Sequence, residues 1–156
     1  MKINLVYGEG MFSAGFLNIS PFPQRDENFI LADLSNLDMF VDDAEAEVII
    51  ANDVINFLPK PTVLSTIDHW LRKLRHGGRI VIGGTDLYEL ARDICKQSVD
   101  LKTVNNTLYG NEIMPWDTRR NSFYTESIVD YLQEKGLEIL KQRVDKYNMI
   151  VEAIRP

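Results

Sequence analysis

The block from Glu47 to Gly83 constrains the fold more than any other part of the chain. It starts with a compact apolar run, Glu47 to Ala51, which is typical of a strand buried on both faces. Apolar residues then recur at helical spacing from Val63 to Leu74, before Gly77-Gly78. A second apolar run, Arg79 to Gly83, follows at once. A strand, a helix and a strand in this order predict an α/β fold with a mostly parallel central sheet.

Three shorter apolar segments come before this block, and we expect each to form a strand. They are Lys2 to Val6, Phe16 to Ile19 and Phe29 to Ala32. The first two are separated by fewer residues than the dozen or more that a parallel crossover through a helix needs. We therefore expect a reduced sheet that lacks its first crossover helix.

The second half of the chain predicts two more helices and a hairpin. Asp86 is placed to cap a helix, and Thr125 is placed to cap another that stops at Lys135-Gly136. The polar segment from Lys96 to Asn121 is long enough to be a functional loop or a lid. Two closing strands, at 137–144 and 147–154, are joined by so short a link that we expect an antiparallel hairpin.

Length and composition exclude several classes of protein. A chain of 156 residues, 45% of them hydrophobic and 26% charged, predicts a single folded domain over residues 1–156. The net charge of -6 argues against a duplex nucleic acid partner. No apolar run approaches the roughly 20 residues of a membrane span, and the N-terminus has no secretory pattern. We therefore expect a cytoplasmic protein without a membrane partner.

Cysteine and histidine offer little chemistry in this sequence. Cys95 is the only cysteine, and its helical spacing from Leu87 and Ala91 predicts a small core residue without a chemical role. With only His69 and His76 in addition, no zinc set can form, and we expect no metal site. The position of His69 on the predicted helix, beside the core face, favours a structural role.

The candidate binding residues follow the predicted strands, because ligands of open α/β sheets bind at the carboxyl ends of strands. Gly8 and Gly10 would let a ligand approach the backbone, although tight turns also carry such glycines. Asp33 and Asn52 have side chains that can pair with the amine and hydroxyl groups of a nucleoside. Each of them is equally suited to capping a helix or making a turn.

Candidates for a catalytic role are less distinct. The chain has no Gly-x-Ser-x-Gly motif of a serine hydrolase. Asp53, Asp86 and Glu112 are possible bases that the sequence does not rank, so the catalytic residues stay unknown. The segment from Trp116 to Arg120 combines an aromatic ring with two cations, and it could hold an anionic substrate or close over a pocket. A solvated loop is the interpretation that we favour for it.

These segments together resemble the class I S-adenosylmethionine-dependent methyltransferases, in particular the short bacterial and phage forms. The block from Val48 to Ile82 carries most of the resemblance, because an apolar strand, a helix that ends near Gly77-Gly78 and another strand follow in the family's order. The other segments that match in order are Lys2 to Gly8, Gly15 to Ile19, Ile30 to Leu34, Leu108 to Glu112, Phe123 and Tyr147 to Ala153.

This resemblance implies a Rossmann-like sheet of about seven strands whose last strand is antiparallel. It also implies S-adenosylmethionine as the cofactor. The family's cofactor-binding positions carry over to Gly8, Gly10, Asp33, Leu34 and Asn52, with Asp33 on the adenine side. If this holds, replacing Asp33 with alanine weakens cofactor binding strongly while the fold persists.

At several positions the sequence departs from the family pattern. Tyr7 and Glu9 stand where the first motif has glycines, and Ser20 stands where an acid usually holds the ribose hydroxyls. Asn56-Phe57 replaces a Glu-His pair, and Arg119 stands at the position of a late histidine. Tyr7 would crowd the cofactor if its side chain points inward, and Glu9 would add negative charge near the cofactor carboxylate. The changes fall on the site, whereas the pattern of the core is intact.

Two hypotheses about function follow. The first is a methyltransferase that acts on a small-molecule or saccharide acceptor. The second is a catalytically inactive, methyltransferase-like domain that binds a protein partner or another ligand. Under either hypothesis, a sheet that lacks a covering helix leaves apolar surface, which a second copy in a homodimer could bury.

Overall fold

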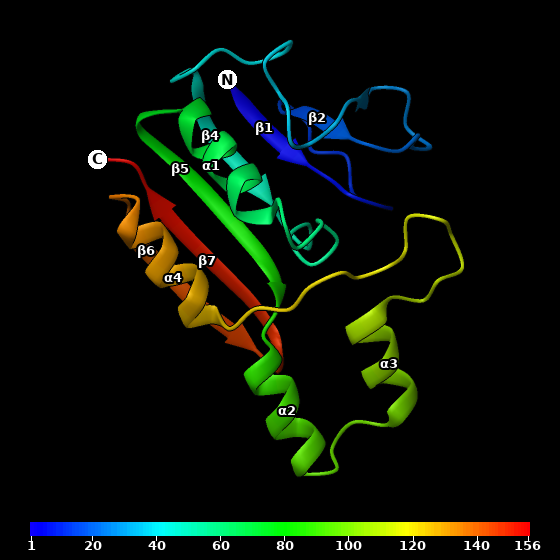
Figure 1. Cartoon of the computed structure of the whole chain (residues 1–156). Helices are drawn as coiled ribbons and strands as arrows, with labels where there is room; N and C mark the ends of the chain where they lie inside the picture. Colours follow the sequence, from blue (N-terminus) through cyan, green and yellow to red (C-terminus); the bar gives the residue numbers. More distant parts are fainter.

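A single sheet of seven strands runs through the computed structural model, which describes residues 1–156, and its strand order is β3-β2-β1-β4-β5-β7-β6 (Figure 1). The first five strands are parallel, and β7 is antiparallel to both of its neighbours. The predicted mostly parallel sheet with a C-terminal antiparallel hairpin is thus confirmed. The strands are β1 (Lys2–Leu5), β2 (Leu17–Ser20), β3 (Ile30–Leu31), β4 (Ala46–Ala51), β5 (Leu74–Thr85), β6 (Glu138–Asp145) and β7 (Asn148–Ile154).

Four helices accompany the sheet, namely α1 (Val63–Lys73), α2 (Leu87–Cys95), α3 (Leu101–Tyr109) and α4 (Thr125–Glu134). Helices α1 and α4 lie on the same face of the sheet in Figure 1, where α1 contacts β5 and α4 contacts β6 and β7. The hydrophobic core forms between them and the strands, and Trp70 is its largest fully buried side chain. We call this side the covered face.

Helix α1 ends earlier than its sequence pattern predicts. The helix stops at Lys73, and β5 begins directly at Leu74 and runs through both glycines. Gly77 has a φ of +72°, and a Cβ on Gly78 would meet the carbonyl oxygens of Ala46 and Arg75. The two glycines therefore allow an irregularity in the strand, where the register between β4 and β5 shifts.

No helix connects β1 to β2, as the short connection predicts. The connecting segment instead lies beside two buried asparagines. Asn4 donates hydrogen bonds to the backbone oxygen of Met11 and to Asn18. Asn18 also accepts one from the amide of Ser13 and donates to the carbonyls of Ser13 and Phe16. Side-chain hydrogen bonds thus fix a segment that has no helical hydrogen bonds of its own.

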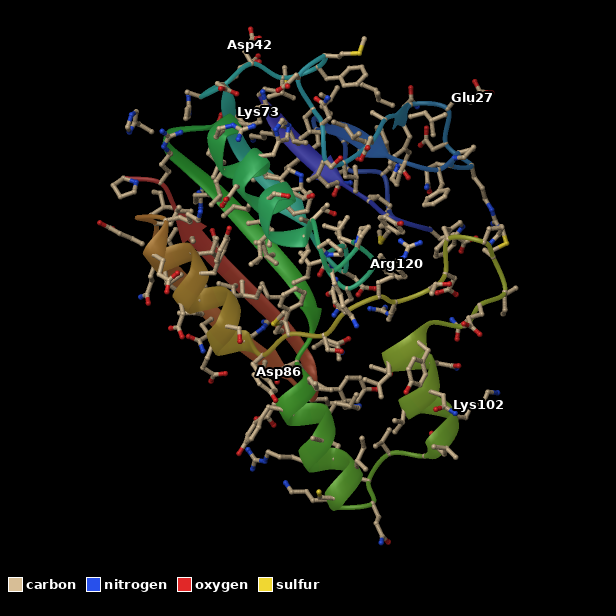
Figure 2. All side chains as sticks on the ribbon, in the orientation of Figure 1. Glu27, Asp42, Lys73, Asp86, Lys102 and Arg120 are labelled. Carbon is tan, nitrogen blue, oxygen red and sulfur yellow. The ribbon has the colours of Figure 1, made fainter.

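The segment between β3 and β4 is attached to α1 by polar contacts. Lys73 Nζ donates to Asp38 Oδ1 at 2.6 Å and to Asp43 Oδ1 at 2.7 Å, and Figure 2 shows Lys73 near the segment that carries Asp42. Burial by itself would lower the pKa of Lys73, but the two carboxylates outweigh it and raise that pKa. His69 Nε2 accepts a hydrogen bond from the Leu37 amide, so the expected structural role of His69 is confirmed.

Three expectations for the second half of the chain were wrong in detail. The segment from Lys96 to Asn121 contains α3, and so it is not only a loop. Cys95 is exposed and is therefore not a core residue. Helix α2 buries a single side chain, that of Leu90. Tyr124, not Thr125, occupies the N-cap position of α4.

The expected hairpin and the cap at Asp86 are confirmed. Asp86 Oδ1 accepts a hydrogen bond from the Glu89 amide at the start of α2, where Figure 2 shows it. Its other oxygen accepts from the amide and the hydroxyl of Thr125, which joins the start of α2 to the start of α4. Burial by itself would raise the pKa of Asp86, but these hydrogen bonds outweigh it and lower the pKa.

Side chains on the opposite face of the sheet are less buried, and we call this side the open face. Val48 and Ile50 of β4 point to it and are half-buried, whereas Ile49 and Ala51 point to the covered face and are fully buried. Strand β7 shows the same alternation. None of the four helices has the length and apolar character to cross a membrane.

Candidate functional site

A cavity of ≈510 Å³ opens at the carboxyl ends of β1 and β4, and we call it the strand-end cavity. Its walls come from three parts of the chain: the segment after β1, the segment after β4, and the segment between α3 and α4. The residues that line it are Asn4, Leu5, Val6, Tyr7, Gly8, Glu9, Gly10, Met11, Ser13, Ile50, Asn52, Asp53, Phe57, Asn111, Trp116, Asp117 and Arg119. The structure therefore brings Gly8, Gly10 and Asn52 together at one cavity.

The other two predicted binding residues lie elsewhere. Asp33 Oδ1 accepts hydrogen bonds from the amide and the hydroxyl of Ser35, both at 2.8 Å, in an exposed turn. Leu34 is buried in the core, and its carbonyl accepts a hydrogen bond from the indole of Trp70. Neither residue is among those that line the strand-end cavity. Their role as cofactor ligands stays a prediction.

An aromatic cluster forms one wall of the strand-end cavity. The ring of Tyr7 stacks on Phe57 with centroids 5.1 Å apart and meets Phe22 edge-on at 5.4 Å. Arg120 donates from one nitrogen to the hydroxyl of Tyr7 and to the carbonyl of Phe57, both at 2.9 Å. Tyr7, which stands where the family's first motif has a glycine, is thus held against neighbouring rings by packing and by a cation.

Trp116 packs directly on Gly8, and a Cβ at that glycine would overlap its indole ring. The ring of Trp116 also lies 6.4 Å from Phe57 and from Phe22, centroid to centroid. Gly8 therefore has a packing reason to be glycine that does not depend on a ligand. Trp116, Asp117 and Arg119 of the segment from Trp116 to Arg120 line this cavity and are at least partly buried, so the interpretation of a solvated loop was wrong.

A second cavity of ≈510 Å³ lies between α3, the ends of β4 and β5, and the tip of the β6–β7 hairpin. We call it the hairpin cavity. Most of its lining is polar, and α3 contributes Thr103, Asn106 and Thr107. The other lining residues are Asn52, Asp53, Gly84, Thr85, Arg119, Arg143, Asp145, Tyr147, Asn148, Met149 and Ile150.

The two cavities share a wall made of Asn52, Asp53 and Arg119. The guanidinium of Arg119 donates to both carboxylate oxygens of Asp53 at 2.8 Å, and it lies 4.5 Å from the ring centroid of Phe57. Arg119 is 16% exposed, whereas Asp53 is 49% exposed. Asp53 also has a φ of +54°, which directs the chain sharply out of β4. A carboxylate with a defined orientation therefore stands where the cavities meet.

The structure ranks the three carboxylates that the sequence left unranked. Asp86 is buried and lines neither cavity, and Glu112, in the exposed segment after α3, lines neither of them either. Of the three, only Asp53 lines both cavities. No group of three or more His, Cys, Asp or Glu side chains is placed to hold a metal ion.

Sequence reasoning missed the contribution of α3 to the hairpin cavity. A signal was present, because Leu101, Val104 and Leu108 recur at helical spacing after Asp100, which occupies the N-cap position. None of the α3 side chains is buried. The apolar residues of α3 therefore do not mark a core-facing side. Thr103, Asn106 and Thr107 on its polar side line the hairpin cavity.

No family model matches the sequence, and no curated protein sequence is detectably similar to it. Solved structures, in contrast, share its fold. A 1,6-didemethyltoxoflavin-N1-methyltransferase from Burkholderia thailandensis, with bound S-adenosylhomocysteine, superposes on 99% of the chain with a TM-score of 0.62 at 10% identity. The chain has the class I methyltransferase fold.

Two further structures share this fold at low sequence identity. A magnesium protoporphyrin IX methyltransferase from Synechocystis PCC 6803 superposes on 92% of the chain with a TM-score of 0.56 at 17% identity. An O-methyltransferase family protein from B. thailandensis superposes on 81% of it with a TM-score of 0.55, also at 17% identity. The match covers 71%, 66% and 35% of these three proteins in the order given, so the chain spans only part of their length.

Proposed function

We propose that this chain is an S-adenosylmethionine-dependent methyltransferase whose cofactor binds in the strand-end cavity. One observation carries the proposal: in a methyltransferase fold, the cavity at the carboxyl ends of β1 and β4 is lined by Gly8, Gly10 and Asn52 and shares a wall with a second, polar cavity. Open α/β sheets bind their ligands at this edge. Two adjoining cavities suit a reaction between a cofactor and an acceptor.

The charges around the strand-end cavity fit a ligand of mixed charge. Arg119 is the one cation among the lining residues, whereas Glu9, Asp53 and Asp117 are acidic. The cofactor carries a carboxylate together with an ammonium and a sulfonium. The N–H groups of Arg119 that Asp53 does not take suit the carboxylate, and Asp53 and Asp117 suit the two positive groups, whereas Glu9 near the carboxylate would oppose binding.

The residues at the shared wall would align the acceptor. When bound, the cofactor supplies a methyl group on a positively charged sulfur. Transfer of a methyl group by direct displacement needs alignment and exclusion of water more than it needs a specialised nucleophile. We assign Asp53 to hold the acceptor hydroxyl by a hydrogen bond and to receive its proton, because its carboxylate is open to both cavities.

The hairpin cavity supports a small, hydroxyl-rich acceptor such as a saccharide. Hydroxyl and amide side chains dominate its walls, with Thr103, Asn106 and Thr107 on one side and Asn148 on the other. Such groups both donate and accept hydrogen bonds, as the hydroxyl groups of a sugar do. An apolar acceptor would leave them without partners.

A second candidate function is a binding domain that transfers nothing. The packing of Trp116 on Gly8 favours it, because the indole covers backbone that a cofactor would approach. In that case the fold would bind a protein partner or a different ligand.

Calorimetric titration with S-adenosylmethionine and S-adenosylhomocysteine, together with melting curves, tests the proposal. We expect micromolar dissociation constants and a ligand-linked rise in melting temperature. Asn52→Ala should weaken binding about fivefold to tenfold through loss of one hydrogen-bonding side chain. Asn36→Ala, in the exposed turn after β3, is the matched control and should leave binding unchanged. Neither heat nor a melting shift at millimolar ligand would refute the proposal and favour the binding domain.

A further inference from the structure

One indole ring covers the glycine segment after β1. Trp116 lies so close to Gly8 that a Cβ on the glycine would overlap the ring. Trp116 and Gly8 both line the strand-end cavity. The ring therefore contacts the backbone that a ligand in this cavity would approach, and the two cannot occupy that position together.

The glycine side of this contact is fixed. Gln24 Nε2 donates to the carbonyl of Gly8 at 2.5 Å and to the hydroxyl of Ser20, at the end of β2, at 2.9 Å. The glycine segment is thus tied to the sheet by a side chain. For the contact to open, the segment that carries Trp116 has to move.

That segment is a compact loop with a narrow neck, and we call residues 110–118 the Trp116 loop. At its neck the amide of Arg119 donates to the carbonyl of Tyr109 at 3.0 Å. Inside it the amide of Glu112 donates to the carbonyl of Asp117, also at 3.0 Å. Gly110, where the loop leaves α3, has a φ of +85°. Ends that meet and internal hydrogen bonds are the geometry of an Ω-loop, which can move as a unit about its neck.

The structure also provides a place for the indole outside the strand-end cavity. A further cavity of ≈730 Å³ adjoins Trp116, and Phe12 and Phe29 line it. These two rings meet edge-on with centroids 6.2 Å apart, and Phe12 is 41% exposed. An indole that moves there exchanges its packing on Phe22 and Phe57 for packing on two other rings. Opening of the loop therefore need not expose the ring to water.

We propose that the Trp116 loop is an autoinhibitory lid, closed in this structure, and that Trp116 must leave Gly8 before S-adenosylmethionine reaches the glycine segment. The inference rests on the proposed function, because it takes the cofactor as the ligand that the ring excludes. A lid lowers the apparent affinity by the fraction of molecules in which it is open. A ring that supported the bound cofactor would raise the affinity. The two roles predict opposite effects for the loss of the ring.

Calorimetry and stopped-flow measurements with S-adenosylhomocysteine test the sign of this effect. Minor conformations are commonly populated at about 10% or less, so Trp116→Ala should lower the dissociation constant by about tenfold or more. The association rate constant should rise by the same factor. The matched control is Ile113→Ala in the same loop, where the side chain is 82% exposed, and it should leave both constants unchanged.

Trp116→Phe supplies a second variant that keeps a ring and serves even where Trp116→Ala does not fold. Its smaller ring covers less of Gly8, so both constants should shift in the same direction by a smaller factor. The chain has two tryptophans, and Trp70 is fully buried in the core. Addition of S-adenosylhomocysteine should therefore change the fluorescence of Trp116 in the unmodified protein. This change should be absent in Trp116→Phe.

The outcomes separate the lid from the proposed function. If the unmodified protein binds S-adenosylhomocysteine and both Trp116 variants bind it equally well or more weakly, the lid is overturned and the methyltransferase proposal stands. Absence of binding to the unmodified protein and to both variants would overturn both proposals.

Discussion

On the covered face of the sheet, Val151 and Ala153 of β7 are fully buried, and helix α4 packs on the strand that carries them. On the open face, Ile150 and Glu152 of the same strand are only half-buried. Successive side chains of a strand point to opposite faces, so one residue along the chain separates a core position from a surface position. The helices thus bury one face of β7, whereas the other face stays partly open to solvent.

Part of the open face is covered by a segment without helical structure. Asn4 of β1 and Asn18 of β2 lie on the open face, in register with Ile50 of β4. Their hydrogen bonds fix the segment after β1 on this face. The same segment carries Gly8 and Gly10 to the strand-end cavity. The site is therefore built where polar contacts replace a covering helix, and the core is built where helices cover the strands.

Removal of the largest core side chain on the covered face should have the largest effect. We expect Trp70→Ala to lower the free energy of unfolding by about 3 to 5 kcal/mol, because it leaves a cavity and an unpaired carbonyl on Leu34. Leu64→Ala, on the exposed side of α1, is the control and should cost less than about 1 kcal/mol. Urea unfolding measures both. Similar losses for the two variants would mean that α1 does not cover the core.

On the open face, the largest effect should come from the asparagine pair. Asn18→Ala removes hydrogen bonds to Asn4, Ser13 and Phe16, and we expect a loss of about 2 to 3 kcal/mol in the same unfolding measurement. Hydrogen exchange of the amide of Ser13 should also become faster. Protection that stays unchanged would show that other contacts hold the segment after β1.

A matched pair of valines compares the faces directly. Val151→Thr keeps the shape of the side chain but puts a hydroxyl into the core without a hydrogen-bond partner. It should lower the free energy of unfolding by about 1 to 2 kcal/mol. Val81→Thr, on the open face of the neighbouring strand, should change the free energy of unfolding by no more than about 0.5 kcal/mol. Equal costs would mean that the open face is covered in solution.

Acidification should have the smallest effect of the four on the free energy of unfolding. It acts on His69 of α1, on the covered face. Burial is the main cause that lowers the pKa of His69, and its Nε2 must stay unprotonated to accept from Leu37. The unfolded chain then binds a proton at higher pH than the folded chain does, so stability should fall as the pH drops below about 6.5. In His69→Gln this part of the pH dependence should disappear, whereas the exposed His76→Gln should keep it.

The block from Val48 to Ile82 was predictable because its strands and helix are buried, and burial imposes a clear apolar period. The final hairpin was predictable from the short link between two apolar runs. Helix α3 was not found, because none of its side chains is buried. Cys95 was misplaced for a related reason, since helical spacing alone does not show that a helix face meets a core.

The candidate site was predictable only in part. Gly8, Gly10 and Asn52 follow strands that end at one edge of the sheet, so their proximity follows from the parallel arrangement. The contacts of Arg119 with Asp53 join residues that are far apart in the sequence, and no local sequence pattern predicts them. The expected homodimer stays a prediction.

The sequence by itself predicted the mostly parallel sheet, the helix from Val63 and the final hairpin, because apolar periodicity and short links are local properties. Only the tertiary structure decided which side chains share the edge at which the parallel strands end. Trp116 reaches Gly8, and Arg119 reaches Asp53, from a segment that returns across the sheet edge after α3 (Figure 1). Such contacts depend on how the whole chain packs, because the residues that make them are separated by most of the fold.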